Sequence, residues 1–235
     1  MFRSVHSRRS FLRKGCAALA VSMAGCSPPL IAARGDLEEK NDILPPPEYL
    51  MRDHGVLSRI LLVYEESIRR MGAGESLPVE SLAQASRMAR NFVEDFHQRL
   101  EEDLLFPRFR KAGRFVDLVT TLVQQHNSGR KLTDAIIQTA TAKGLKDPEG
   151  RRVLIESMQQ YIRIYRAHAA REDTVLFPGV RGIMTPREFA LMGEEFENRG
   201  EERYGYTGYF RIVEQVTDIE KRLGIADLAK LTPSP

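Results

Sequence analysis

Residues 97–107 read His-Gln-Arg-Leu-Glu-Glu-Asp-Leu-Leu-Phe-Pro, and residues 168–178 read His-Ala-Ala-Arg-Glu-Asp-Thr-Val-Leu-Phe-Pro. Both segments place a glutamate four residues after the histidine, and both end in Phe-Pro. Positions i and i+4 of a helix lie on one face, about 6 Å apart along the axis. Each segment can therefore direct an imidazole and a carboxylate toward one metal ion.

Two further histidines extend this pattern into an internal repeat. His54 precedes His97 by 43 residues, and His126 precedes His168 by 42 residues. The unit His…His-x-x-x-Glu thus occurs twice, with a period of about 71 residues. The chain has five histidines, and the four outside the N-terminal region all belong to the repeat. A lone histidine is usually a satisfied core or surface residue, but this regularity indicates a shared site.

Hydrophobic residues recur at helical spacing around each histidine. The pattern predicts four helices, at about residues 47–71, 76–106, 114–141 and 148–177. Helices of this length with short connections favour an all-α, antiparallel up-down bundle over residues 48–178. In such a bundle the four histidines fall at the same depth, so their side chains are expected to meet.

Polar residues and prolines mark the ends of the predicted helices. Ser76 is expected to cap the second helix, and Asp147 followed by proline is expected to cap the fourth. Residues 179–235 do not repeat and form a helical extension. Thr185 begins a capping box there, and helices are expected to about residue 199 and over about 210–223. The extension either closes over the metal end or serves as a structural buttress.

The two repeats offer nitrogen and oxygen donors and no thiolate. Such donors suit iron, manganese or zinc and not a soft metal. One ion needs only three or four side chains, so six donors in matched halves favour two adjacent ions bridged by the glutamates. The predicted ligands are His54, His97, Glu101, His126, His168 and Glu172.

These residues resemble the hemerythrin-like, or HHE cation-binding, family. The resemblance spans about residues 49–178 and includes the Leu-Phe-Pro endings of both halves. It implies a four-helix bundle with two non-haem iron ions (Fe2+ or Fe3+) joined by an oxo or hydroxo bridge. It also implies that the six residues are the iron ligands, and that the centre binds dioxygen or responds to oxygen, iron or nitric oxide.

The sequence departs from the oxygen-carrying branch of that family. That branch has another histidine four residues after the third-helix ligand, where this chain has Arg130. It also ends in His-x-x-x-x-Asp; Asp173 has that spacing, but Glu172 fits the repeat. Fewer histidines imply an extra water, or help from Glu102 or Asp173, and count against stable oxygen carriage. Arg130 points either toward the site, where its charge favours an anionic ligand, or to solvent.

Three tyrosines fall near the predicted site. Tyr165 lies one turn before His168, and Tyr64 and Tyr161 have similar depths in the bundle. Two interpretations stay open. A hydroxyl donates a hydrogen bond to a metal ligand, or each tyrosine belongs to the core and turns its hydroxyl to solvent.

The first 26 residues predict an export signal. They hold five of the 35 basic residues and no acidic one, which leaves 30 basic against 32 acidic residues in the rest. The basic pI therefore gives no argument for nucleic-acid binding. Arg8-Arg9, the Phe-Leu that follows and a short apolar run resemble a twin-arginine signal. This predicts a periplasmic or cell-envelope protein.

Residues 23–26, Met-Ala-Gly-Cys, resemble a lipoprotein cleavage site with Met where Leu is usual. Retention of Cys26 gives a lipid anchor, the one membrane contact that we expect, whereas cleavage after Ala24 gives a soluble protein. Residues 27–47 are rich in proline and predict an exposed tether. Cys16 leaves with the signal in either case, so no intramolecular disulfide is expected.

Three functions remain open from the sequence. We favour a binding protein for dioxygen or a related small ligand, acting as a sensor, scavenger or carrier. The alternatives are an oxidoreductase that turns over peroxide, oxygen or nitric oxide, and an iron-handling protein. The sequence has no Ser-His-Asp triad and no glycine-rich phosphate loop, so no catalytic residue is predicted. It identifies no protein partner.

Overall fold

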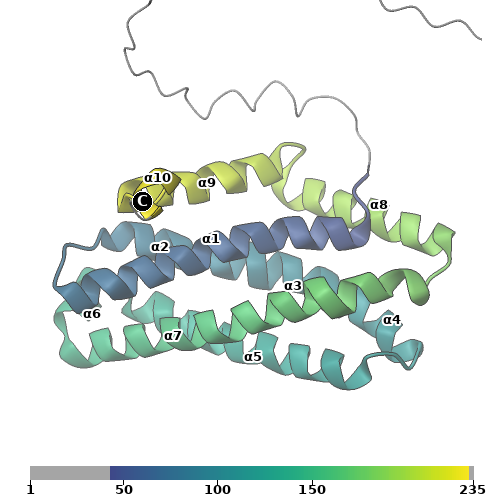
Figure 1. Cartoon of the computed structure of the whole chain (residues 1–235), viewed down its shortest axis with the longest axis horizontal. Coiled ribbons are helices and arrows are strands. Elements are labelled where there is room, and N and C mark those ends of the chain that lie inside the picture. The colour runs from purple at the N-terminus through teal and green to yellow at the C-terminus, as the bar shows by residue number, and fades with distance from the viewer. Residues whose placement is uncertain (1–42, 233–235) are drawn as a thin grey trace, which may run out of the picture. The chain divides into compact units, whose positions relative to one another are not determined.

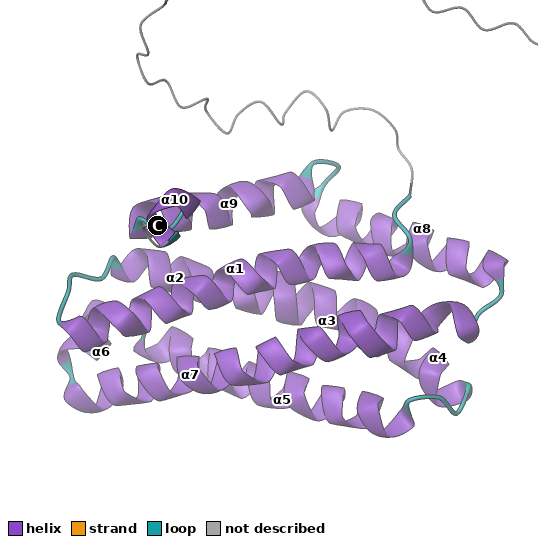
Figure 2. Ribbon diagram, in the orientation of Figure 1, coloured by secondary structure: helices purple, strands orange, loops and turns teal. Residues whose placement is uncertain are grey.

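The computed structural model describes residues 43–232, and every regular element within that range is a helix (Figures 1 and 2). The predicted all-α fold class is confirmed. The predicted export signal (1–26) and residues 27–42 of the predicted tether lie outside the described residues. None of the described helices has the length and apolar character needed to cross a membrane.

Four helical rods correspond to the four predicted helices. Each runs close to the range that the hydrophobic pattern predicts, and a short helix, α6 (Ala142–Lys146), connects the last two. The rods are α1 (Pro46–Ala73); α2 (Val79–Met88), α3 (Gln98–Leu100) and α4 (Phe106–Lys111), linked by helical turns; α5 (Val116–Thr139); and α7 (Pro148–Arg171), extended by further turns to Gly182.

The rods lie side by side, and successive rods are joined by short connections at alternate ends (Figure 1). α5 packs against α7, α7 against α1, α1 against α2, and α2 against α5, which closes a ring of four. The predicted apolar stripes meet inside this ring. Each fully buried leucine contributes roughly 2 kcal/mol of hydrophobic stabilisation. Examples are Leu50, Leu57, Leu82, Leu122 and Leu154.

Two helices begin at residues other than the predicted ones, and in both cases a proline determines the first residue. α1 begins at Pro46, within the predicted tether, because proline is well suited to the first helical turn. The predicted cap at Ser76 is wrong, since Pro78 stands at the N-cap of α2. A residue that precedes proline avoids the helical conformation, so this helix cannot begin earlier. Asp147 does cap α7, where it accepts a hydrogen bond from the Gly150 amide.

The helices that carry the His-x-x-x-Glu segments are not regular α-helices. Residues 89–97, 101–105 and 172–176 wind as π-helix, with hydrogen bonds from residue i to i+5. Such wide turns are rare and are frequently found at functional sites. His97 ends the first of them, and Glu101 and Glu172 begin the other two. Each His-x-x-x-Glu segment therefore adjoins a π turn.

The C-terminal extension forms α8 (Pro186–Tyr204), α9 (Gly208–Leu223) and α10 (Leu228–Leu231). The predicted capping box is present between Thr185 and Glu188. α8 packs on α1, and α9 packs on α1 and α2. An ion pair of 2.5 Å between Arg59 and Glu220 fastens α9 to α1. The extension is thus a buttress along one side of the bundle, and α8 also contacts the turn over residues 177–182 at the metal end.

Candidate metal centre

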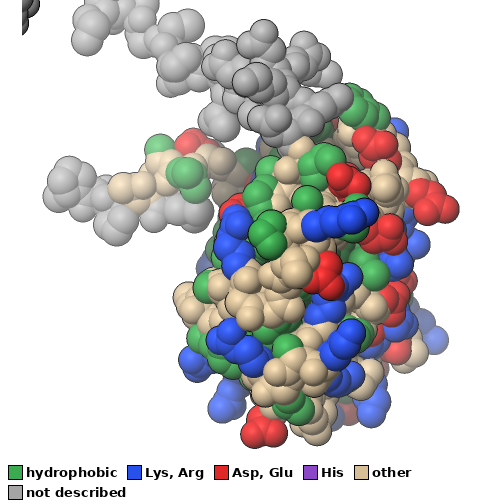
Figure 3. Space-filling model, turned by 90° about the vertical axis from the view of Figure 1, so that its right-hand side faces the viewer, with side chains coloured by type: hydrophobic (Ala, Val, Ile, Leu, Met, Phe, Trp, Pro, Cys, Tyr) green, Lys and Arg blue, Asp and Glu red, His purple; other side chains and the backbone are tan. Residues whose placement is uncertain are grey.

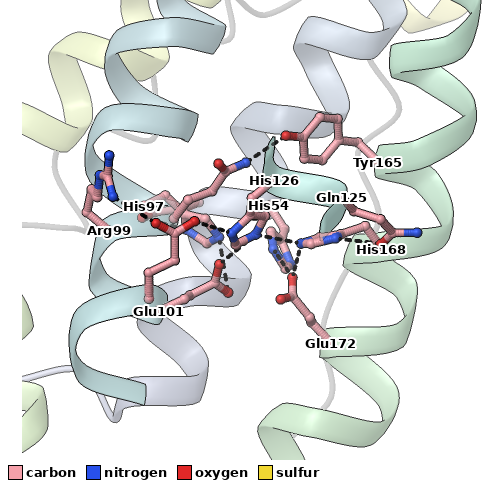
Figure 4. A network of polar contacts seen from close by, with 12 residues as sticks. His54, His97, Arg99, Glu101, Gln125, His126, Tyr165, His168 and Glu172 are labelled. Carbon is pink, nitrogen blue, oxygen red and sulfur yellow. Dashed lines mark hydrogen bonds and ion pairs between the residues drawn. The ribbon is translucent and has the colours of Figure 1, made fainter. Parts of the chain in front are cut away.

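The structure brings the six predicted ligands together inside the bundle (Figure 4). All four rods contribute, and each of the six side chains is buried. α1 carries His54, the second rod carries His97 and Glu101, α5 carries His126, and the last rod carries His168 and Glu172.

Within each repeat, the histidine and the glutamate face one another as their i, i+4 spacing predicts. His97 Nε2 lies 3.6 Å from Glu101 Oε1. His168 Nε2 lies 3.1 Å from Glu172 Oε2. Imidazole nitrogen and carboxylate oxygen therefore converge from one helix face, although a π turn follows in both cases.

Each glutamate also faces a histidine of the other repeat. Glu101 Oε2 lies 3.4 Å from His126 Nε2, and Glu172 Oε2 lies 3.4 Å from His54 Nε2. A carboxylate placed between two imidazoles is suited to bridging two cations. The donor atoms fall into two sets, each within 4.8 Å, that share Glu101: one is Glu101, His126, His168 and Glu172, the other His54, His97 and Glu101.

All four histidines turn Nε2 toward the glutamates and Nδ1 toward a polar side chain outside the donor set. An acceptor at Nδ1 fixes the proton there, orients the ring and leaves the Nε2 lone pair for a cation. The pairs are His54–Asp173 at 2.7 Å, His97–Asp53 at 3.3 Å, His126–Glu102 at 2.8 Å and His168–Gln125 at 2.9 Å.

Sequence reasoning missed the positioning residues or gave them another role. The sequence leaves open an extra water at the metal or help from Glu102 or Asp173, whereas in the structure each of these carboxylates accepts from an Nδ1 atom. Asp53 and Gln125 were not singled out. The available signal was their position, because all four are direct sequence neighbours of a ligand. Each of these four polar side chains contacts a predicted ligand on the neighbouring rod and not the ligand beside it in the sequence.

The phenylalanine that ends each repeat stacks on a histidine of the other repeat. The Phe177 ring lies 5.5 Å from the His54 ring, and the Phe106 ring lies 5.7 Å from the His126 ring. Both phenylalanines are fully buried. Figure 3 views the molecule from the end where α4 lies, and no histidine is visible on that face. Packed side chains thus close this end of the site.

Several buried donor atoms have no hydrogen-bond partner within the described part of the chain. They include Nε2 of His54 and His97 and both carboxylate oxygens of Glu101 and Glu172. A buried carboxylate without a partner costs several kcal/mol, so such groups are paired or bind metal in stable proteins. These atoms face one another in the two donor sets, and cations held between them would satisfy them. The donor set therefore fits a metal centre.

Burial and the charges of neighbouring groups shift the pKa values of these side chains. Burial and the charge of Glu172 raise the pKa of Glu101 well above its ordinary value. Burial lowers the pKa of His126 to about 4 against the opposing hydrogen bond to Glu102. For His54, burial also lowers the pKa, but Asp173 and Glu172 outweigh it and raise the pKa to about 9. Without metal the centre thus holds protons, and metal binding must release them.

Arg130 does not turn to solvent, since its side chain is 17 % exposed. Its Nη2 donates to Glu102 Oε1 at 2.8 Å, the same oxygen that accepts from His126 Nδ1. Burial raises the pKa of Glu102, but the hydrogen bonds from His126 and Arg130 outweigh it and lower the pKa to about 2. Arg130 therefore keeps Glu102 ionised as the acceptor that positions His126.

The three tyrosines form a buried row beside the site. Tyr64, Tyr161 and Tyr165 are at most 1 % exposed, so the expectation of hydroxyls turned to solvent is wrong. The Tyr165 hydroxyl accepts a hydrogen bond of 2.8 Å from Gln98 Nε2, and its ring lies 5.5 Å from the His168 ring. No hydrogen bond joins a tyrosine hydroxyl to a predicted ligand within residues 43–232. The tyrosines thus contact the donor set through packing alone.

A buried carboxylate outside the donor set predicts a pH effect on stability. Glu94 is fully buried, accepts from Thr133 at 2.5 Å and pairs with Arg90 at 2.7 Å. Burial raises its pKa from 4.5 to about 7. The folded chain holds this proton more tightly than the unfolded chain, so stability falls as pH rises between these two values. Glu94→Gln is expected to remove that fall, on the order of 3 kcal/mol.

Urea unfolding of the metal-free protein at pH 5 and pH 8 measures this effect. The wild type is expected to lose more unfolding free energy between the two pH values than Glu94→Gln does. An equal change in both proteins would show that Glu94 ionises as readily in the folded state as in the unfolded state.

The comparisons with known proteins agree with this geometry. The family model described as "Hemerythrin HHE cation binding domain" matches residues 46–189, a range that contains all six predicted ligands. The chain therefore belongs to the hemerythrin HHE cation-binding family.

Relatives in mycobacteria match nearly the whole chain. It is similar to Uncharacterized protein Rv1995 of Mycobacterium tuberculosis and to Uncharacterized protein Mb2018 of Mycobacterium bovis. Each is 42 % identical over 218 residues, which cover 92 % of this chain and 86 % of the relative. No solved structure matches the chain significantly.

Proposed function

We propose that the protein is an antiparallel up-down four-helix bundle of the hemerythrin type that holds two non-haem iron ions and binds dioxygen or a related small ligand. The observation that carries this proposal is the buried cluster of imidazole nitrogens and carboxylate oxygens around Glu101 and Glu172, whose carboxylate oxygens face histidine Nε2 atoms and accept no other hydrogen bond among the described residues. Family membership supports a cation at this place. The nitrogen and oxygen donors suit iron, manganese or zinc, and the hemerythrin family match favours iron among them.

The chain's own residues would orient and shield such a centre. Glu101 and Glu172 lie between the two histidine pairs and would bridge the ions. Asp53 and the three other Nδ1 partners hold the histidine rings. Phe106 and Phe177 exclude water from the end of the bundle. When bound, an iron pair supplies one-electron redox chemistry and vacant coordination positions for a small ligand.

An oxidoreductase acting on peroxide, oxygen or nitric oxide is the second candidate. The observation that favours it is the small number of donors, because Glu102 and Asp173 are engaged with histidine Nδ1 atoms and Arg130 pairs with Glu102. Two ions sharing six donors keep positions for water or substrate. An iron-handling role fits less well, since ions that exchange readily need accessible ligands and these six are buried.

Metal analysis combined with absorption spectroscopy tests the proposed function. We expect purified protein to contain two iron ions per chain and to show a visible absorption band that changes when azide is added to the oxidised form. Zinc alone at full occupancy, or iron without any response to azide, would contradict the proposal. Turnover of peroxide over many cycles with a reductant would select the second candidate.

We also propose that the chain is exported by the twin-arginine route to the periplasm or cell envelope. Arg8, Arg9 and Cys26 support this through sequence alone, since they precede the described residues. Replacing both arginines by lysine is expected to retain the protein in the cytoplasm, because that route reads the arginine pair and not its charge. Unchanged delivery would refute the assignment. Fatty-acid labelling decides whether Cys26 is retained as a lipid anchor.

A further inference from the structure

A groove runs between α1 and α7 beside the candidate metal centre. It has a volume of about 440 Å³. Its rim carries small residues, among them Gly55 and Ala170, and both of these residues are exposed. Its floor includes His54 and Tyr165, which are buried. His54, a predicted metal ligand, therefore forms part of the groove floor.

The groove connects the donor set to solvent through one pair of side chains. Asp173 also lines it, is 35 % exposed and accepts a hydrogen bond of 2.7 Å from His54 Nδ1. The opposite nitrogen, His54 Nε2, lies 3.4 Å from Glu172. A molecule on the groove floor is thus separated from the donor atoms by one imidazole ring. The end of the bundle, by contrast, is closed by Phe106 and Phe177.

The lining suits a small uncharged molecule. Apolar side chains such as Met51, Leu57 and Ala169 form most of it. Two charged residues also border the groove, and both are already paired: Asp173 with His54, and Arg166 with Glu65 at 2.5 Å. The lining therefore offers no free charge to attract or hold an ion. A diatomic ligand loses little on leaving water for such a surface.

We propose that this groove is the access route by which an uncharged diatomic ligand reaches the metal centre, passing between α1 and α7 at His54 and Tyr165. This inference rests on the proposed function, because it names the ligand class and the path for the same site. Protein interiors are close-packed, so access is fastest where the fewest packed side chains separate the centre from solvent. On the groove floor one imidazole ring, that of His54, separates a ligand from the donor atoms.

Gly55→Trp tests the route by filling the groove from its rim. A Cβ added at Gly55 meets nothing within 4 Å, so the first atom of the new side chain enters open space. Gly72→Trp is the matched control, because Gly72 is also in α1 and its added Cβ is equally free. The chain contains no tryptophan, so each variant has a single indole. In metal-free protein, we expect blue-shifted fluorescence at position 55 and solvent-exposed emission at position 72.

Stopped-flow mixing of reduced, iron-loaded protein with nitric oxide measures access. In Gly55→Trp we expect the association rate to fall at least about tenfold with iron content and equilibrium affinity unchanged, and in Gly72→Trp no change. Ala170→Trp fills the groove from α7 and should behave like Gly55→Trp, which provides a second test should either variant fold poorly.

A blue-shifted indole at position 55 combined with a wild-type association rate would overturn the access route. That outcome leaves the proposed function intact, since the centre still binds its ligand. Wild-type protein that lacks iron, or that holds iron and does not bind nitric oxide, would instead count against the proposed function itself. The two failures are therefore distinguishable within one experiment.

Discussion

Glu172→Gln is expected to reduce bound iron from two ions per chain to one or none. Glu172 lies between two imidazoles, 3.1 Å from His168 Nε2 and 3.4 Å from His54 Nε2. Burial raises its pKa, but His168 and His54 outweigh that effect and lower the pKa well below its ordinary value, so the bridging position holds an anion. The glutamine side chain has nearly the same shape as that of Glu172 but carries no negative charge.

The expected loss of metal affinity is at least about 100-fold, since loss of a residue that only positions a ligand already costs 10–100-fold. A 100-fold weaker site forfeits about 2.7 kcal/mol of metal-linked stability, or roughly 5–10 °C in the thermal midpoint of a chain of this size. Metal analysis and thermal unfolding with and without a chelator measure both effects.

Glu94→Gln is the control for Glu172→Gln, because Glu94 is equally buried and lies outside the donor set. It is expected to keep both iron ions. Normal iron content in Glu172→Gln would contradict the ligand assignment, and iron loss in both variants would attribute the effect to the removal of any buried charge.

The reduced protein is expected to oxidise rapidly in air and not to hold oxygen for hours. Oxygen carriers of this family have another histidine where this chain has Arg130, and Arg130 pairs with Glu102. Glu102 and Asp173 are held at histidine Nδ1 atoms. With these side chains engaged, a bound iron pair would keep positions for water or a small ligand, and electron transfer to oxygen would compete with reversible binding.

Mixing anaerobic reduced protein with oxygen and following the visible spectrum tests this expectation. A reversible oxygen complex that lasts for hours in the wild type would refute it and restore the carrier interpretation. Arg130→His provides the converse test. If the number of histidine donors limits the lifetime, this variant should hold oxygen longer than the wild type does.

The sequence predicted the helices and the donor cluster because both follow from periodicity. Helical spacing places the apolar stripe, and the i, i+4 rule places His97 with Glu101 without knowledge of tertiary structure. The residues around the donors were harder to predict. Asp53 precedes a ligand of its own rod, yet it positions His97 on the next rod at 3.3 Å. That contact depends on side-chain rotamers and helix rotation, which no spacing rule contains.

Other features depend on interactions between distant segments. The π turns at residues 101–105 and 172–176 have no sequence signal that the helical pattern reveals. The direction of Arg130 was set by Glu102, 28 residues away in sequence. The start of α2 follows from Pro78, which keeps the residue before it out of the helix, although Ser76 has the side chain of a helix cap. The placement of α9 along α1 depends on contacts between segments far apart in the sequence, among them the pair Arg59–Glu220 and the buried side chains of Val216 and Ile219.

Each histidine that opens a repeat is completed by the other repeat. His54 is held at Nδ1 by Asp173, faces Glu172 and is covered by Phe177, all from the second repeat. The same three contacts occur in reverse around His126, and all come from the first repeat. Glu102 holds its Nδ1, Glu101 faces its Nε2, and Phe106 covers its ring.

The centre thus has the symmetry of a homodimer contained in one polypeptide. A single ancestral helix pair would have left its first histidine unsupported, and two identical copies related by a two-fold axis would have completed one another. Duplication and fusion of such a gene would yield the observed period. It follows that a chain cut in the connection between α4 and α5 should regain its iron only when both fragments are present together.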